Sequence, residues 1–387
     1  MKAVLSEDTP AAQVWVARLA LTDYRSYRRL DLDLDARPVC LVGKNGAGKT
    51  NILEALSMLG PGKGLRNAGL PDLASRLGPS RAWAVAAEIE RLGDRRTIGV
   101  GVQPDADGNL RRSARVDGRS VGPGELARAL GLLWVTPAMD RVWAGPTGDR
   151  RRLFDRLVFA HAPEHGQTAT AYERAMRERQ RLLDEGTRDP KWLASLEAEM
   201  AAHGVAMAAA RIETLRLLQA AIDSRPDGAF PKADLSLEGP LEANILANAP
   251  AVALEDKFAA DLARNRPRDA AARRALDGPH RTDFRARHRQ RDMPAAECST
   301  GEQKALLIGL ILANARALGE RPGAANPLLL LDEATAHLDA ERRGALADEI
   351  AALGGQAWLT GVEQSLFEAF GRRTQTFEIR DGFARRL

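Results

Sequence analysis

A glycine-rich loop at residues 43–50 constrains the fold of this chain more than any other feature of its sequence. The loop matches every fixed position of the pattern GxxxxGK[ST], whose backbone surrounds phosphate groups. The apolar run Val39–Val42 precedes it and an amphipathic stretch, residues 49–59, follows it, as expected for a strand and a helix. A glycine turn that binds nothing is the alternative, and both flanks argue against it. The sequence therefore predicts a phosphate-binding loop in an α/β fold.

The chemistry of the loop residues predicts ATP and Mg²⁺ as ligands. Consecutive backbone N–H groups and the N-terminus of the helix attract phosphate oxygens. Lys49 is expected to neutralise the β and γ phosphates, and the Thr50 hydroxyl is expected to bind Mg²⁺. The predicted nucleotide-binding residues of the loop are Gly43, Lys44, Asn45, Gly46, Ala47, Gly48, Lys49 and Thr50.

Two carboxylates, Asp332 and Glu333, directly follow the apolar run Leu328–Leu331. Parallel α/β sheets bind their ligands at the carboxyl ends of their strands, where an acid needs a cation or a proton. We predict that Asp332 binds Mg²⁺ and that Glu333 polarises the attacking water, with Lys49 as the third catalytic group. The alternative, a pair of acids that only caps the next helix, fits less well in a chain that carries the phosphate loop.

Alternating patterns at both ends of the chain predict β structure. Residues 14–35 read as a hairpin, and three alternating runs within residues 82–116 predict an antiparallel sheet. Helix and strand patterns alternate again from residue 302 to residue 360, which predicts a parallel sheet with crossover helices.

Helical periodicity dominates the middle of the chain. It predicts a helical hairpin from residues 168–183 and 191–222, and a further helix over residues 254–276. The middle is therefore an insertion into one nucleotide-binding domain. We predict an α/β fold: a P-loop ATPase head with a mixed sheet and an antiparallel β subdomain, and an inserted α-helical second lobe. The predicted divisions are 1–147, 148–277 and 278–387.

Ser299 and Gly301 lie at the start of the predicted helix 302–318. Read alone, Ser299 with Glu302 is a helix-capping box. Its place 33 residues before Asp332 (332 minus 299) favours a second interpretation, because the segment there resembles the SxGxxx signature loop of ABC-type ATPases.

The ABC-type resemblance implies roles for several residues. It implies that Ser299 and Gly301 contact the γ-phosphate of an ATP held by a partner subunit. Residues 337–339, His-Leu-Asp, resemble the D-loop of that superfamily. Thr360 stands where transporter-type ATPases carry a histidine, which implies a γ-phosphate contact from its hydroxyl.

Five segments in the same order resemble the bacterial RecF family of recombination and gap-repair proteins, over nearly the whole chain. They are residues 21–27 (LTDYRSY), the loop with Asn51 after it, Gly145-Pro146 followed by three arginines at 150–152, residues 278–283 (GPHRTD) and residues 299–303. The resemblance implies an ABC-type head that dimerises with ATP and hydrolyses it slowly, as a switch rather than a motor. It also implies binding to DNA at single-strand gaps, with partner proteins of the RecO and RecR type.

Three other classes of ATPase fit the sequence less well. An SMC- or Rad50-like chromosome-associated head requires helical arms of hundreds of residues, which the hairpin within residues 168–222 does not provide. A transporter subunit predicts a switch histidine and a far shorter separation than the 250 residues between Lys49 and Ser299 (299 minus 49). A head fused to a nuclease requires a second acidic metal cluster, which the sequence does not show.

Ten arginines fall between residues 264 and 291, against three acids, the densest positive charge in the chain. Part of this run alternates as a strand does and projects several guanidinium groups from one face toward DNA phosphates. The predicted DNA contacts are Arg281, Arg285, Arg287 and Arg289. Pairing of these arginines with acidic segments is an equally weighted alternative.

Composition adds a few exclusions. The pI is about 9.2 although the formal net charge is only +4, and 48 of the 56 basic residues are arginine. Two distant cysteines, Cys40 and Cys298, exclude a disulfide scaffold and favour a reducing compartment. No apolar run approaches the roughly 18 residues that span a bilayer. We therefore expect a cytoplasmic protein that binds no membrane.

Overall fold

The structure is a computed structural model that describes residues 14–78, 81–91, 93–105, 107–186, 189–321, 326–336 and 338–387. It divides into two compact units. Unit 1 comprises the described residues of Met1–Asp140, Pro226–Pro231 and Thr300–Leu387. Unit 2 comprises those of Arg141–Arg225 and Lys232–Ser299.

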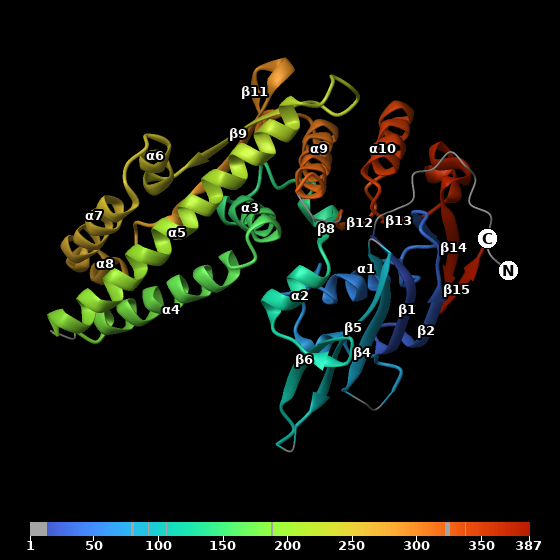
Figure 1. The fold of residues 1–387 in the computed structure, drawn as a ribbon, viewed down its shortest axis with the longest axis horizontal. Helices are drawn as coiled ribbons and strands as arrows, with labels where there is room; N and C mark the ends of the chain where they lie inside the picture. The colour runs from blue at the N-terminus through green and yellow to red at the C-terminus, as the bar shows by residue number, and fades with distance from the viewer. Residues whose placement is uncertain are drawn as a thin grey trace. The chain divides into compact units, whose positions relative to one another are not determined.

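Unit 1 contains a six-stranded antiparallel sheet with the order β2-β1-β4-β5-β6-β7 (Figure 1). The predicted hairpin and the predicted antiparallel strands are both confirmed, and they form one sheet because β1 pairs with β2 on one edge and with β4 on the other. The strand bounds are β1 (Val14–Tyr24), β2 (Tyr27–Asp33), β4 (Trp83–Arg91), β5 (Asp94–Pro104), β6 (Leu110–Val116) and β7 (Arg119–Ser120).

A second six-stranded sheet of unit 1 has the order β15-β14-β3-β13-β12-β8. Its strands are β3 (Val39–Val42), β8 (Leu132–Val135), β12 (Leu328–Leu331), β13 (Ala357–Gly361), β14 (Gln375–Arg380) and β15 (Phe383–Arg386). Five of these strands run parallel, and β15 joins the edge in the antiparallel sense. The predicted parallel sheet is confirmed, and β3, β12 and β13 are buried along their whole length because the sheet is covered on both faces.

The helix after the phosphate loop, α1 (Lys49–Met58), contacts both sheets of unit 1, through β4 and β13. One apolar core joins α1 to side chains of both sheets, among them Leu19, Val85, Leu41 and Trp358. The C-terminal end of α1 is held from the antiparallel sheet, because the Arg112 guanidinium donates hydrogen bonds to the carbonyl groups of Met58 and Gly60 at 2.7 and 2.6 Å. The phosphate loop therefore lies at the N-terminus of a helix whose side chains pack against both sheets and whose C-terminus is fixed by Arg112.

The other helices of unit 1 are α2 (Pro123–Ala129), α9 (Thr300–Gly319) and α10 (Ala340–Leu353), with short 3₁₀ turns at Leu70–Leu73, Pro137–Met139 and Gln364–Arg373. The predicted helix 302–318 corresponds to α9, which is buried along most of its length. Helix α10 falls within residues 302–360, where alternating helices and strands were predicted, and the Asp339 carboxylate caps its N-terminus by accepting from the Arg342 amide at 2.8 Å.

Unit 2 is mainly helical. Its helices are α3 (Thr147–His161), α4 (His165–Asp184), α5 (Pro190–Asp223), α6 (Pro240–Leu246), α7 (Ala251–Arg264) and α8 (Arg266–Ala272). The predicted helical hairpin is confirmed, and α4 lies beside α5 (Figure 1). The single helix predicted over residues 254–276 is wrong, because the chain breaks at Asn265 and Pro267 then occupies the first turn of α8. No helix in the described part of the chain is both long and apolar enough to cross a membrane.

A three-stranded sheet completes unit 2, with the order β11-β10-β9. Its strands are β9 (Ala233–Glu238), β10 (Asp283–His288) and β11 (Met293–Pro294), and short 3₁₀ turns lie at Pro279–Arg281, Arg289–Arg291 and Ala295–Glu297. Because β10 pairs with β9 over six residues, residues 232–299 cluster with the helices. The division drawn from the sequence at residues 277/278 therefore differs from the contact-based division at 299/300.

Candidate functional site: a phosphate-binding loop and two carboxylates

The phosphate loop of unit 1 leaves β3 and enters α1 through three glycines with positive φ angles, Gly43, Gly46 and Gly48. A Cβ atom on Gly43 would collide with the carbonyl oxygen of Ile379, and one on Gly48 would lie 2.7 Å from the Tyr27 hydroxyl. Glycine is therefore required at both ends of the loop by the φ angle and by the space. The helix N-terminus has no side-chain cap, so its first N–H groups are free to bind an anion.

The ammonium group of Lys49 lies over the loop. It donates to the carbonyl oxygens of Gly43 and Lys44 at 2.5 and 2.9 Å. Burial lowers the pKa of Lys49, and the nearby charges of Glu333 and Asp332 oppose that shift. The structure thus places the lysine and the two acids, which the sequence singled out separately, within electrostatic reach of one another.

Asp332 connects the loop to the neighbouring strands of the parallel sheet. Its Oδ1 atom accepts hydrogen bonds from the hydroxyl groups of Thr50 and Thr360, at 2.9 and 2.8 Å. Asp332 is 5% exposed, and no described residue donates a hydrogen bond to its second carboxylate oxygen. A hydroxyl and an open carboxylate oxygen are ligands that suit Mg²⁺, so the residues present fit the predicted metal.

Glu333 has a left-handed backbone conformation, with φ of 50°. Its amide donates to the Thr360 hydroxyl at 2.9 Å, and its carbonyl accepts from the Lys304 ammonium at 2.9 Å. A non-glycine residue in this conformation is costly and occurs preferentially where function requires it. Two side chains from two segments therefore hold the backbone of Glu333: Thr360 bonds to its amide and also to the Asp332 carboxylate, and Lys304 bonds to its carbonyl.

Lys304 and Asp140 are site residues that the sequence analysis missed. Lys304 lies in the first turns of α9, is 3% exposed, and places its ammonium 3.4 Å from Oδ2 of Asp140. A lysine at the start of an otherwise apolar helix needs a buried partner, and this was the signal available in the sequence. The same ammonium donates to the Glu333 carbonyl, so Lys304 links α9 both to Asp140 and to the turn that carries Glu333.

A second cluster lies against the first turns of α1, and its members Glu54 and Arg66 were not singled out from the sequence. The buried carboxylate of Glu54 accepts two hydrogen bonds from Arg25, both at 2.8 Å, and lies 3.5 Å from the guanidinium of Arg66. Asn51 joins the same cluster by accepting from Arg66 and donating to Ser26, both at 2.9 Å. Two guanidinium groups are thus fixed beside the helix that begins the phosphate site.

A pocket of about 760 Å³ lies beside the first half of the loop. Its lining includes residues 42–47 of the loop, Val362 and Gln364 after β13, and residues 378–381 at the end of β14. These segments are the carboxyl ends of three adjacent strands, where a parallel sheet binds its ligands.

The two signature residues lie at the start of α9. Ser299 is exposed and is the last residue of unit 2, whereas Gly301 is half-buried in the first turn of α9 in unit 1. A Cβ atom on Gly301 would meet nothing within 4 Å. Of the D-loop segment, Leu338 is buried and Asp339 caps α10, while His337 lies outside the described residues.

The four predicted DNA contacts have different surroundings in unit 2. Arg285 pairs with Glu238 at 2.8 Å, Arg287 pairs with Asp292 at 2.6 Å, and Arg289 pairs with Asp223 and Asp234 at 2.6 and 2.7 Å. Arg281 is exposed, and no carboxylate of the described residues lies within 4 Å of its guanidinium. Arg151, whose guanidinium donates to the Thr282 carbonyl at 3.3 Å, likewise has no such partner. Burial, and then the charges of neighbouring arginines that include Arg281, lower the pKa of Arg151.

Comparisons with known proteins give the family. A family model described as the RecF/RecN/SMC N terminal domain matches residues 15–384. The chain is 50% identical over 372 residues to a DNA replication and repair protein RecF of Rhizobium meliloti (strain 1021), covering 96% of this chain and 98% of that protein. It is 51% identical over 362 residues to a protein of the same description from Caulobacter sp. (strain K31), covering 90% and 92% of the two chains.

Solved structures show the same fold at lower identity. The structure described as the recombination mediator protein RecF-ATPrS in the RecFOR pathway aligns with a TM-score of 0.83 at 20% identity, covering 98% of this chain and 99% of that chain. An Smc head domain from Pyrococcus furiosus aligns with a TM-score of 0.52 at 18% identity, covering 97% and 96%. The fold is therefore that of an ABC-type ATPase head with a second, helical unit, and the chain belongs to the RecF family.

Proposed function

We propose that this chain is an ATP-binding protein of DNA replication and recombinational repair that hydrolyses ATP slowly and uses the nucleotide state to control its residence on DNA. The observation that carries the proposal is the shared hydrogen bonding of Asp332 by Thr50 and Thr360, with Lys49 and Glu333 beside it. This arrangement provides a phosphate loop, a metal-binding carboxylate and a second carboxylate for water, which are the parts that phosphoryl transfer requires.

The chemistry follows from these side chains. The loop amides and Lys49 bind and orient the β and γ phosphates, and Thr50 and Asp332 would hold Mg²⁺. The metal, when bound, neutralises charge that develops on the phosphate oxygens. Glu333 would orient the attacking water and accept its proton. The Thr360 hydroxyl, which bonds to the Glu333 amide and to the Asp332 carboxylate, would contact the γ-phosphate.

A homodimer formed around ATP is part of the proposal. Ser299, which is exposed, and Gly301, in the first turn of α9, would contact the γ-phosphate of an ATP bound to a second copy. Hydrolysis would remove the group that both copies bind and release the dimer. Action at single-strand gaps, together with mediators of the RecO and RecR type, is proposed from membership of the RecF family.

We expect Ser299→Arg to abolish dimerisation without abolishing ATP binding. The longer, charged side chain would occupy the space of the partner's phosphate, whereas the loop of the same chain is unchanged. Sedimentation velocity with Mg-ATP, with and without gapped DNA, measures the dimer, and fluorescence of a labelled ATP analogue measures binding. Thr300→Arg, which changes the exposed neighbour, is the control. A wild-type protein that stays monomeric with ATP and DNA would refute the role of Ser299 toward a second copy.

Of the four predicted DNA contacts we keep Arg281, and we add Arg151, because no carboxylate of the described residues lies within 4 Å of either guanidinium. We expect Arg281→Ala to weaken binding to gapped DNA by about tenfold and to reduce its dependence on salt. Arg287→Ala, which breaks an existing ion pair with Asp292, is the matched control and should change affinity little. Equal effects of the two substitutions in fluorescence anisotropy would contradict the assignment.

A further inference from the structure

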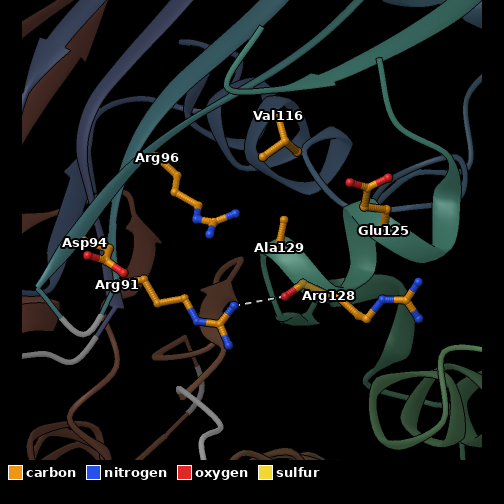
Figure 2. A pocket seen from close by; sticks show the side chains of 7 residues that line it. All are labelled: Arg91, Asp94, Arg96, Val116, Glu125, Arg128 and Ala129. Atoms are coloured by element: carbon orange, nitrogen blue, oxygen red, sulfur yellow. Dashed lines mark hydrogen bonds between the residues drawn. The ribbon is translucent and has the colours of Figure 1, made fainter. Parts of the chain in front are cut away.

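A cavity of about 310 Å³ opens on the antiparallel sheet of unit 1 (Figure 2). Strands β4, β5 and β6 and helix α2 supply its walls. Its lining residues are Arg91, Asp94, Arg96, Val116, Glu125, Arg128 and Ala129. None of these residues belongs to the phosphate loop or to the segments around Asp332 and Glu333.

Two arginines lie at this end of the sheet, on the face that is buried farther along their strands: Arg91 is half-buried and Arg96 is exposed. Side chains two residues apart on a strand share a face, so Arg91 lies on the face of the buried Ile89, and Arg96 lies on the face of the buried Ile98. The same face carries Val116, which pairs with Ile98. The buried row on this face therefore ends at Ile89 and Ile98, and an arginine follows it on each strand.

The two guanidinium groups converge on the cavity. Figure 2 shows the side chains of Arg91 and Arg96 extending into it, whereas the side chain of Arg128 points away. Arg91 donates a hydrogen bond at 2.9 Å to the carbonyl oxygen of Arg128, which holds its guanidinium in place at the edge of α2. The position of Arg91 is therefore fixed by the backbone rather than by an acid.

Neither of these two groups is held in a close ion pair. Within the described part of the chain, no carboxylate lies within 4 Å of the Arg91 guanidinium, and the contact of Arg96 with Asp117 is long, at 3.9 Å. Arg95, on the opposite face of the same strand, pairs with both Glu90 and Glu88, at 2.5 and 3.2 Å. On the outward face, Glu88 and Glu90 neutralise Arg95. On the cavity face, the guanidinium groups of Arg91 and Arg96 keep N–H donors that form no close contact with a carboxylate of the described residues.

We propose that this cavity binds a terminal phosphate group through Arg91 and Arg96. Planar guanidinium groups bind phosphate oxygens in pairs of hydrogen bonds, and two of them match the charge of a phosphate monoester. Val116 and Ala129 provide an apolar wall for the carbon atoms attached to the phosphate. A free phosphorylated small molecule and the phosphorylated end of a nucleic-acid strand share this chemistry.

The acids of the lining favour a single terminal group over a continuous phosphate backbone. Asp94 and Glu125 also line the cavity, and each repels any further phosphate near it. A strand that lay across the cavity would bring several phosphates close to these acids, whereas one terminal phosphate enters a recess that holds two arginines. The size of the recess suits a phosphate with its sugar rather than a duplex.

The test compares a single-stranded oligonucleotide carrying a 5′-phosphate with the same strand carrying a 5′-hydroxyl, by fluorescence anisotropy on the full chain. We expect the wild type to prefer the phosphorylated strand by about tenfold, and Arg91→Gln with Arg96→Gln to show no preference. Arg95→Gln, on the opposite face, should keep the full preference. Calorimetric titration with inorganic phosphate is run on the same three proteins, and the phosphate loop, unchanged in all of them, contributes equally to each.

Each outcome either identifies the ligand, as a nucleic-acid end or a free phosphorylated molecule, or contradicts the proposed phosphate site. An end preference that is lost only in the double variant assigns the site to nucleic-acid ends. Phosphate binding that is lost in the double variant, without any end preference, assigns it to a free phosphorylated molecule. If the double variant and Arg95→Gln behave alike in both measurements, the proposal is wrong. Ala129→Glu, which places a carboxylate in the cavity without removing either arginine, gives the same comparison if the double variant does not fold.

Discussion

Replacement of Glu333 by glutamine is expected to slow ATP hydrolysis by about 10²- to 10⁴-fold, the range that a general base contributes. Glutamine keeps the size of the side chain and removes the negative charge that orients water and accepts its proton. ATP binding should remain, because the loop, Lys49 and the Thr50–Asp332 contact are unchanged. Phosphate release at steady state measures the rate, and equilibrium binding of a labelled ATP analogue measures the affinity.

The control for this prediction is Glu341→Gln, which removes an exposed carboxylate from the first turn of α10. It should leave both the rate and the affinity unchanged. Hydrolysis at the wild-type rate in Glu333→Gln would show that another group activates the water. A combined loss of binding and hydrolysis would instead place Glu333 among the residues that hold the nucleotide.

Replacement of Lys304 by methionine is the second large effect that we expect. Methionine keeps the length and packing of the side chain but cannot bind the Glu333 carbonyl or the Asp140 carboxylate. Without that contact the left-handed turn at Glu333 is free to relax, and a displacement of about 1 Å at a reacting group can cost about 100-fold in rate. We expect kcat to fall by about that factor, while the KM for ATP changes little.

The division of the effect between kcat and KM tests a positioning role for Lys304. Lys257→Met, at an exposed position of α7, is the matched control and should change neither kcat nor the KM for ATP. Thermal unfolding of each variant, measured with and without ATP, reports whether the fold is retained. A loss of ATP affinity as large as the loss of kcat would mean that Lys304 supports the unit as a whole and not the orientation of Glu333.

The sequence was most informative where function depends on neighbouring residues. The loop at residues 43–50 and the acids after Leu331 form continuous patterns, so their places at the ends of β3 and β12 could be predicted. Strands β8, β14 and β15 were missed, because short runs of four to six residues between polar segments carry little periodicity. Their partners in the sheet come from remote parts of the chain.

Contacts between distant residues explain what the sequence could not provide. The acids that pair with Arg285 and Arg289 lie at residues 238, 223 and 234, so a run of arginines looked more available than it is. Lys304 and Asp140 are 164 positions apart, and Arg25 and Glu54 are 29 apart. In each case the residue type was visible in the sequence, whereas its partner became visible only when the fold brought the two together.

The strand order of the parallel sheet also has a consequence for synthesis. Strand β3, which carries the phosphate loop, has β13 and β14 as its two neighbours, and these begin only at residues 357 and 375. A ribosome makes the chain from its N-terminus, so β3 has no parallel partner on either edge until residues 357–361 have been made. The segments of unit 2 emerge well before that point. The proposed nucleotide site therefore forms only after β13 has been made, and we expect a product truncated before residue 357 to lack nucleotide binding.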